Sequence, residues 1–199
     1  MRKIIFLFLG PMLLSATGLP KGAFLVGSVG SALEVSCRRD YSICVSDTSP
    51  RPLFSLGFEK KISEKESWSL EIEARPFKIK RLEWENLEWG YDEDINEYFL
   101  TYSRKRYFRT KGLRFYGRGY LGLAFVNFYA TYDYPWGREK EERFGIGPQA
   151  GIGLGMEMGG HHRVSFEILA RFILSDFSTE AFATNFFGAK IGLCLSHCH

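Results

Sequence analysis

The chain has 199 residues, of which 45% are hydrophobic, 16% aromatic and 25% charged. This length fits one domain with a buried core, and the aromatic content excludes a disordered chain. A mean hydropathy of -0.14 excludes a bundle of membrane helices, and a net charge of +3 provides no basic surface for nucleic acid, which is not an expected partner.

Residues 1–18 are predicted to form a cleaved signal peptide, with cleavage as late as residue 23. Arg2 and Lys3 provide a positive start, a short apolar run follows, and small residues at 16–18 offer a cleavage site. No later stretch approaches the ~20 apolar residues that a transmembrane helix needs. The mature domain, residues 19–199, is therefore predicted to be exported, and a membrane-inserted form of it would not be helical.

The mature chain alternates apolar and polar residues with the period of a β-strand. In residues 68–75, WSLEIEAR, the apolar side chains fall on one face and the charged ones on the other. In 97–108 the outward face stays open, since either Leu100 or Thr101 could belong to it. Eight strands are predicted, at 23–35, 52–62, 67–78, 97–108, 113–127, 144–158, 163–174 and 185–196.

The connections between these segments alternate between short and long. Those near 63–66, 109–112 and 159–162 are short turns, whereas 36–51, 79–96, 128–143 and 175–184 are long, polar and charged. An antiparallel meander with this alternation places all short turns at one end and all long loops at the other. Outer-membrane β-barrels have that layout, with short periplasmic turns and longer extracellular loops.

Two segments carry a resemblance to a known family. Residues 97–125, EYFLTYSRKRYFRTKGLRFYGRGYLGLAF, and 144–158, FGIGPQAGIGLGMEM, resemble the central hairpin and the following glycine-rich strand of small OmpA/OmpX-like outer-membrane proteins. The resemblance implies an all-β fold, an eight-stranded antiparallel up-and-down transmembrane β-barrel in the bacterial outer membrane. It also implies outer-membrane lipid and lipopolysaccharide as surroundings.

The lumen of such a barrel is only wide enough for side chains, so the polar face is expected to fill it with paired charges. Arg114 and Glu157 fall at similar heights on neighbouring strands and are expected to pair. The glycines between 145 and 155 would make room for arginine and tyrosine, and no stable open pore is expected. The predicted lumen charges are Glu71, Glu73, Arg75, Arg114, Arg118, Glu157, Glu167, Arg171 and Lys190.

Two other classes of protein remain as alternatives. A secreted, soluble lipocalin-like barrel would reverse the faces and bind a small apolar ligand in its interior. A lipid-A-modifying enzyme would need Ser, His and an acid near the long loops. The sequence favours neither. Catalysis is not expected, because the four histidines all fall at the opposite end: His161, His162, His197 and His199. A metal site at Cys194 and residues 197–199 is not expected because a chain terminus rarely holds one, and no cofactor is expected.

The long loops are expected to carry the surface function, which is a structural role or contact with an extracellular protein, a glycan or lipopolysaccharide headgroups. Cys37 and Cys44 flank six residues of the first loop and are a candidate disulfide in an oxidising compartment. Cys194 and Cys198 could bridge only if the chain turns after residue 195. The candidate contact residues in the loops are Trp84, Trp89, Tyr91, Tyr132, Tyr134 and Trp136.

Overall fold

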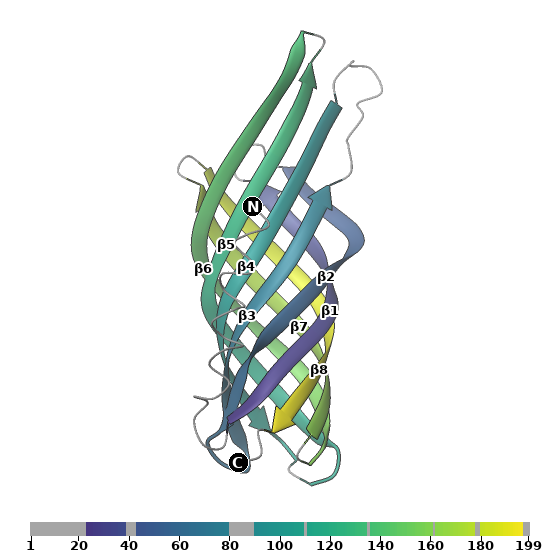
Figure 1. The fold of residues 1–199 in the computed structure, drawn as a ribbon, viewed down its shortest axis with the longest axis vertical. Helices are drawn as coiled ribbons and strands as arrows, with labels where there is room; N and C mark the ends of the chain where they lie inside the picture. Colours follow the sequence, from purple (N-terminus) through teal and green to yellow (C-terminus); the bar gives the residue numbers. More distant parts are fainter. Residues whose placement is uncertain are drawn as a thin grey trace.

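The computed structural model is a closed β-barrel in which each strand pairs antiparallel with its neighbours in sequence, and the first strand pairs with the last (Figure 1). It describes residues 23–38, 43–79, 90–109, 111–134, 136–160, 162–177 and 180–196, and side chains over most of these ranges. The predicted signal peptide, residues 1–18, lies outside the described residues. Among those residues, no helix is long and apolar enough to cross a membrane.

All eight predicted strands are present, and the fold class is confirmed. The strand order around the barrel follows the sequence from β1 to β8, as in an up-and-down barrel. The strand bounds are β1 Ala23–Arg38, β2 Ile43–Lys61, β3 Glu66–Ile79, β4 Gly90–Tyr107, β5 Arg114–Tyr134, β6 Gly137–Gly159, β7 His162–Phe177 and β8 Glu180–Ser196.

The predicted short turns all lie at one end of the barrel, called here the short-turn end. Residues 62–65 join β2 to β3, 108–113 join β4 to β5, and 160–161 join β6 to β7. In the second turn, Gly112 has a φ of 65°, which is the left-handed region that glycine enters without strain. Short turns at this end hold consecutive strands in antiparallel register.

The four long loops are a prediction that the structure corrects. Most of residues 36–51, 128–143 and 175–184 lie in strands, and only 39–42, 135–136 and 178–179 remain between them. The connection 80–89 is the longest of the four. The sequence FYATYDY at 128–134 is rich in aromatic residues and threonine, which favour strands. Pairing of β5 and β6 continues past the apolar belt described below, where Phe128 and Ala130 are still buried but residues 138–143 are all charged.

The continued strands form a sheet that projects beyond the barrel at the end opposite the short turns (Figure 1). β4 pairs with β5 as far as Gly90 opposite Asp133, and β5 with β6 as far as Tyr134 opposite Gly137. By contrast, the pairing of β6 with β7 ends at Ile146. We call residues 90–96, 127–134 and 137–144 the protruding sheet.

The two faces of the barrel wall differ in polarity. On β4, Phe99, Thr101 and Ser103 are buried in the interior, whereas Leu100 and Tyr102 are exposed on the outside, which settles the face that the sequence left open. The same alternation holds on β6, where Ile152 and Leu154 are 70% and 66% exposed. The barrel therefore carries its large apolar side chains outside and its charges inside.

Candidate functional site

The lumen holds a set of charged side chains that come from strands all around the barrel. All nine lumen charges predicted from the sequence are buried there, including Arg114 and Glu157, which lie opposite each other on β5 and β6. Four more charged residues share the lumen and were missed. The complete set in the described part of the chain is six carboxylates, Glu59, Glu71, Glu73, Glu97, Glu157 and Glu167, and seven cations, Arg75, Lys105, Arg114, Arg118, Arg163, Arg171 and Lys190.

The largest group of charges lies near the short-turn end, and we call it the turn-side cluster. Glu157 accepts hydrogen bonds from Arg114 at 2.5 Å, Arg163 at 3.0 Å and Lys105 at 3.1 Å. Glu59 accepts from Lys105 at 2.8 Å and from Arg163 at 2.9 Å. Two carboxylates thus hold three cations, and each carboxylate accepts hydrogen bonds from more than one cation. This cluster joins β2, β4, β5, β6 and β7 across the lumen.

A second group, the central cluster, consists of Glu71, Arg118, Glu167 and Lys190. Arg118 is paired with Glu71 and lies 3.5 Å from Glu167, while the Lys190 ammonium is 3.7 and 3.8 Å from the same two carboxylates. The Tyr116 hydroxyl donates to Glu167 at 2.9 Å. Charges of both signs therefore balance within this cluster, as buried ions require.

Beyond the central cluster, two pairs lie toward the protruding sheet. Arg171 binds both oxygens of Glu73, at 2.6 and 2.8 Å, and Arg75 donates to Glu97. Around them the lumen is also filled by apolar side chains, and the Arg171 guanidinium lies 4.3 Å from the centre of the Tyr120 ring. The apolar group comprises Ala32, Leu53, Phe99, Tyr120, Ala124, Leu169 and Ile173.

Glycines on β6 make the room that these large groups need. A Cβ on Gly155 would lie 2.5 Å from the Tyr116 ring, and one on Gly151 would lie 2.7 Å from the Arg171 side chain. The lumen keeps a cavity of about 30 Å³ between the turn-side and central clusters. That volume holds one or two water molecules, which could solvate the Lys190 ammonium.

The protruding sheet is the second candidate site. Glu141 and Arg143 form an ion pair at 2.5 Å on β6, and a hydrogen bond to Glu142 raises the pKa of the Tyr129 hydroxyl. Trp136 lies at the tip and is 75% exposed. Of the other predicted contact residues, Trp84 and Trp89 lie outside the described residues, as do the side chains of Tyr91, Tyr132 and Tyr134, whose backbones lie in β4 and β5.

The predicted cysteine pair lies where β1 and β2 run past the belt. The register places Cys37 directly opposite Cys44, although both side chains lie outside the described residues, so the disulfide stays a prediction. Cys194 is buried, and Arg163 lies 2.7 Å from its sulfur. Cys198 lies outside the described residues, which leaves its pairing with Cys194 a prediction too.

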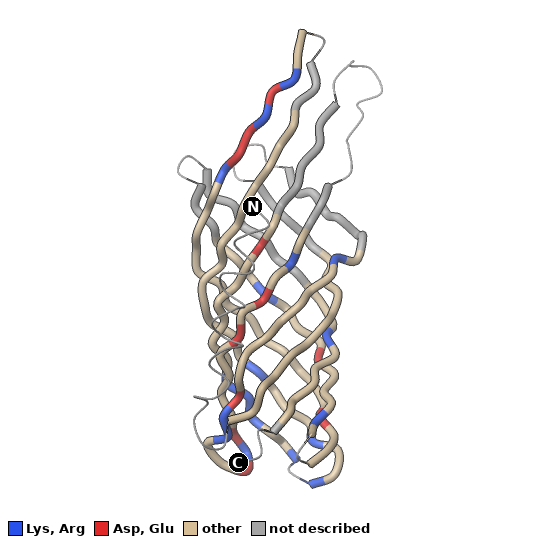
Figure 2. Tube along the Cα trace, in the orientation of Figure 1, with Lys and Arg blue, Asp and Glu red and all other residues tan. Residues whose placement is uncertain are grey.

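The outer surface forms an apolar belt. On β6, every outward position from Phe144 to Met158 is apolar. A strand tilted by ~45° rises roughly 2.3 Å per residue along the barrel axis, so this run spans about the ~30 Å of a hydrocarbon core. Charges are sparse in the middle of the barrel in Figure 2 except where they point into the lumen. The chain is an eight-stranded outer-membrane β-barrel. A soluble, lipocalin-like barrel would carry its apolar face inside and its charged face outside, which is the opposite of the arrangement in the structure.

No protein-family model and no curated protein matches this chain. Among solved structures it is similar to Ail, the attachment invasion locus protein of Yersinia pestis, at 18% identity and a TM-score of 0.48, over 87% of this chain and 99% of that one. It is also similar to neisserial surface protein A at 15% identity and a TM-score of 0.49, over 86% and 98%. The outer membrane protease OmpT from Escherichia coli is similar at 8% identity and a TM-score of 0.49, over 89% and 97%.

Few candidate catalytic or metal-binding side chains lie outside the lumen in the described part of the chain. No group of three His, Cys, Asp or Glu residues there could hold a metal ion. His162 is exposed at the short-turn end, while His161, His197 and His199 lie outside the described residues. Inside the lumen, the Ser69 hydroxyl is hydrogen-bonded to Glu71 at 2.6 Å and receives a hydrogen bond from Arg118. The Ser69 hydroxyl therefore helps to hold the central cluster together.

Proposed function

We propose that this protein is a non-enzymatic outer-membrane barrel that presents the protruding sheet to partners at the cell surface. One observation carries the proposal: among the described residues, 137–145 of β6 pair only with β5, because the pairing with β7 ends at Ile146. The backbone N–H and C=O groups along the other edge of that segment are open to an extended peptide, which could add as a further strand.

The sequence of this edge suits selective rather than indiscriminate pairing. Residues 138–143, REKEER, carry charges of both signs, and charged side chains protect an exposed edge from aggregation. A partner segment with complementary charges would pair, whereas an apolar segment would leave these charges unsolvated. An extracellular protein is thus the favoured partner, with glycans and lipopolysaccharide headgroups as other ligands of the sheet.

The lumen has a structural role in this proposal. The ion-pair clusters and the apolar group fill the interior, so the barrel acts as a rigid support for the sheet and forms no stable pore. Steady single-channel conductance in planar bilayers would overturn the closed lumen. The lipid-A-modifying alternative would be favoured instead if expression of the protein changed the mass of lipid A.

The proposal also includes the finer assignments from sequence. The barrel belongs with the small OmpA/OmpX-like proteins, residues 1–18 are removed on export, and the short turns face the periplasm. The orientation can be tested with a protease added to intact cells. Cleavage within the protruding sheet supports it, and cleavage confined to the short turns opposes it.

The decisive experiment removes the β5 and β6 strands of the protruding sheet and keeps the barrel. Because Phe128 lies opposite Arg143, residues 129–142 can be replaced by Asn-Gly, a two-residue turn that closes the shortened hairpin. A library of ten-residue peptides is selected on the wild-type protein and then measured on both forms. We expect the selected peptides to bind the wild-type protein only. Equal binding to the shortened protein, or no enrichment at all, would overturn the proposal.

A matched variant separates backbone pairing from charge recognition. Exchanging Lys140 and Glu142, as K140E/E142K, keeps the composition and the strand edge but reverses the local charge pattern. Peptides chosen for charge complementarity should lose affinity by about ten-fold or more, as like charges directly opposite each other repel. Both variants must retain the heat-dependent shift in gel mobility that reports a folded barrel.

A further inference from the structure

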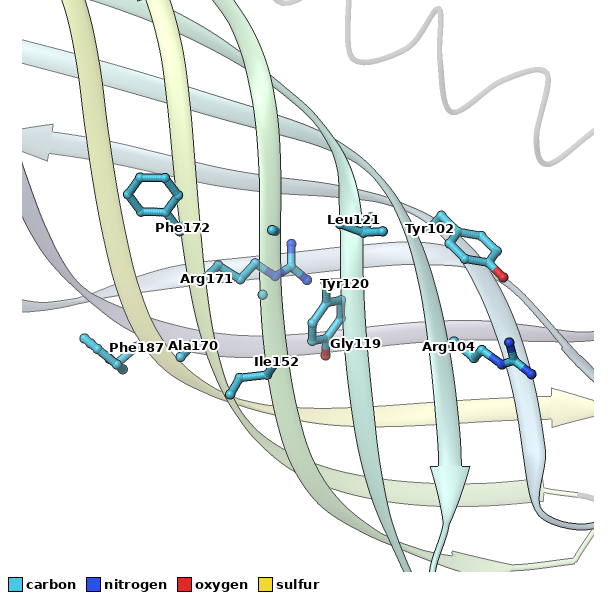
Figure 3. Close-up of a pocket in the computed structure, with 12 residues that line it drawn as sticks. Tyr102, Arg104, Gly119, Tyr120, Leu121, Ile152, Ala170, Arg171, Phe172 and Phe187 are labelled. Carbon is cyan, nitrogen blue, oxygen red and sulfur yellow. The ribbon is translucent and has the colours of Figure 1, made fainter.

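The outer wall of the barrel has a groove over β5, β6 and β7. Gly119 and Ala170, labelled in Figure 3, form its floor together with Ala150, so that each of these strands contributes one small residue. Larger side chains stand on both sides, with Tyr102 and Arg104 toward β4 and with Phe172 and Phe187 toward β8. The groove has a volume of about 720 Å³, within the range of sites that bind lipid-sized or drug-sized molecules.

The floor is low on either side of Ile152, because Gly119, Ala150 and Ala170 are its neighbours on the outer face. Gly119 lies opposite Ile152, and Ile152 opposite Ala170, while Ala150 lies opposite Phe172 one pair further along. A Cβ added to Gly119 would meet no heavy atom within 4 Å. The space above this glycine is thus free of protein, and it faces the hydrocarbon of the membrane. The geometry calls for an apolar occupant.

Aromatic side chains at one end of the groove indicate a membrane interface. Tyr102 stacks on Trp68 with ring centres 6.3 Å apart, and Trp68 meets Phe58 at 5.4 Å. Tryptophan and tyrosine concentrate at the level of lipid headgroups. Arg104 lies two residues closer to the short-turn end than Tyr102, so its guanidinium reaches the headgroup layer of the leaflet on that side.

The charge at this end is positive. Arg104 is exposed and paired with Glu66 at 2.6 Å, and Arg106, also exposed, lies opposite the same Glu66 in the register. Two guanidinium groups and one carboxylate therefore lie on neighbouring strand positions here, which leaves a net positive charge. The adjacent turns add further exposed cations, and Figure 2 shows basic positions at this end of the barrel. They are Lys61, Lys65, Arg109 and Lys111.

We infer that the groove binds one anionic phospholipid from the leaflet on the short-turn side. An acyl chain lies over Gly119 between the aromatic walls, and the phosphate contacts Arg104 and Arg106. The apolar groove and the cations complement the two ends of this one molecule. The site is on the opposite part of the barrel from the protruding sheet, so it holds or fails independently of the proposed surface function.

The test is native mass spectrometry of the full-length protein in a mild detergent with equal amounts of phosphatidylglycerol and phosphatidylcholine carrying the same acyl chains. We expect one retained phosphatidylglycerol on the wild-type protein. Gly119→Leu fills the groove and should abolish retention, whereas Ala74→Leu places the same side chain on the outer face away from the groove and should not. R104Q/R106Q should reduce the preference for the anionic lipid by about five-fold per arginine.

Three results would overturn the inference: equal retention by Gly119→Leu and the wild-type protein, no preference between the two lipids, or co-purification of lipopolysaccharide in the groove in place of phospholipid. Each variant is first tested for the heat-dependent shift in gel mobility. If Gly119→Leu does not fold, Ala170→Leu blocks the same floor from β7 and gives the same reading.

Discussion

Glu157 binds all three cations of the turn-side cluster. Replacing it with a neutral residue therefore tests how much the lumen ion pairs stabilise the barrel. Three cations contact this carboxylate, Lys105, Arg114 and Arg163, and the Tyr107 hydroxyl donates to it at 3.3 Å. In Glu157→Gln the shape of the side chain is kept and one negative charge is lost. Lys105 and Arg163 then keep Glu59 as a partner, whereas Arg114 loses its carboxylate.

The expected cost follows from the cations that lose their partner. Removing one member of a buried ion pair costs ~3–5 kcal/mol, mostly because the remaining charge stays buried without compensation. Glu73→Gln is the matched comparison, since it leaves a single cation, Arg171, which still donates to Gln149 at 3.1 Å. We expect Glu73→Gln to cost about 3 kcal/mol and Glu157→Gln about 5 kcal/mol or more.

A second substitution tests the cause. Among the ion pairs of the turn-side cluster, Arg114 contacts Glu157 only, so Arg114→Met removes the cation that would be left without a carboxylate. In the double variant we expect about 1–3 kcal/mol of the loss to return. The assay is urea unfolding of the barrel in phospholipid vesicles, followed by tryptophan fluorescence. The reasoning is refuted if Glu157→Gln costs less than Glu73→Gln, or if Arg114→Met makes Glu157→Gln less stable.

Three further predictions concern the wall and the strands beyond it. Gly155→Val should lower the free energy of unfolding by ~1–3 kcal/mol, because the new side chain meets Tyr116; an unchanged urea midpoint would contradict this. Leu154→Arg places a charge in the lipid and should cost ~2–4 kcal/mol in the same assay, whereas a neutral result would place this position outside the membrane. Cys37 and Cys44 should resist alkylation until the protein is reduced, and rapid alkylation without reductant would show two free thiols.

The sequence was sufficient to predict the wall of the barrel. Period-two alternation identified all eight strands, because an inward polar face and an outward apolar face leave a direct mark on the residue pattern. The pairing of Arg114 with Glu157 followed from counting residues along two neighbouring strands, which placed the two side chains at similar heights. Lys105 was missed because its strand carries apolar and polar residues on both faces. Only closure of the barrel decides which face is inside.

Beyond the belt, the same reasoning did not apply. Residues 128–143 were interpreted as a loop because the segment is polar and rich in charge, yet they form the outer part of the hairpin of β5 and β6. Once a strand leaves the hydrocarbon, both of its faces can be polar, and the signal that identified the wall disappears. The lipid groove was missed for a different reason. Gly119, Ala150 and Ala170 are far apart in sequence, and only the register brings them together.

The two halves of the molecule depend on each other physically. A free hairpin of two strands is at best marginally stable in water, and the protruding sheet has only three strands with charged residues along its open edge. Its order comes from its base, where β4, β5 and β6 continue into a wall held by ion pairs that cross the lumen, such as Lys105 to Glu59 and Arg118 to Glu71. A lumen that could open would loosen that base. The dense packing of charge in the barrel therefore gives the narrow protruding sheet a firm base.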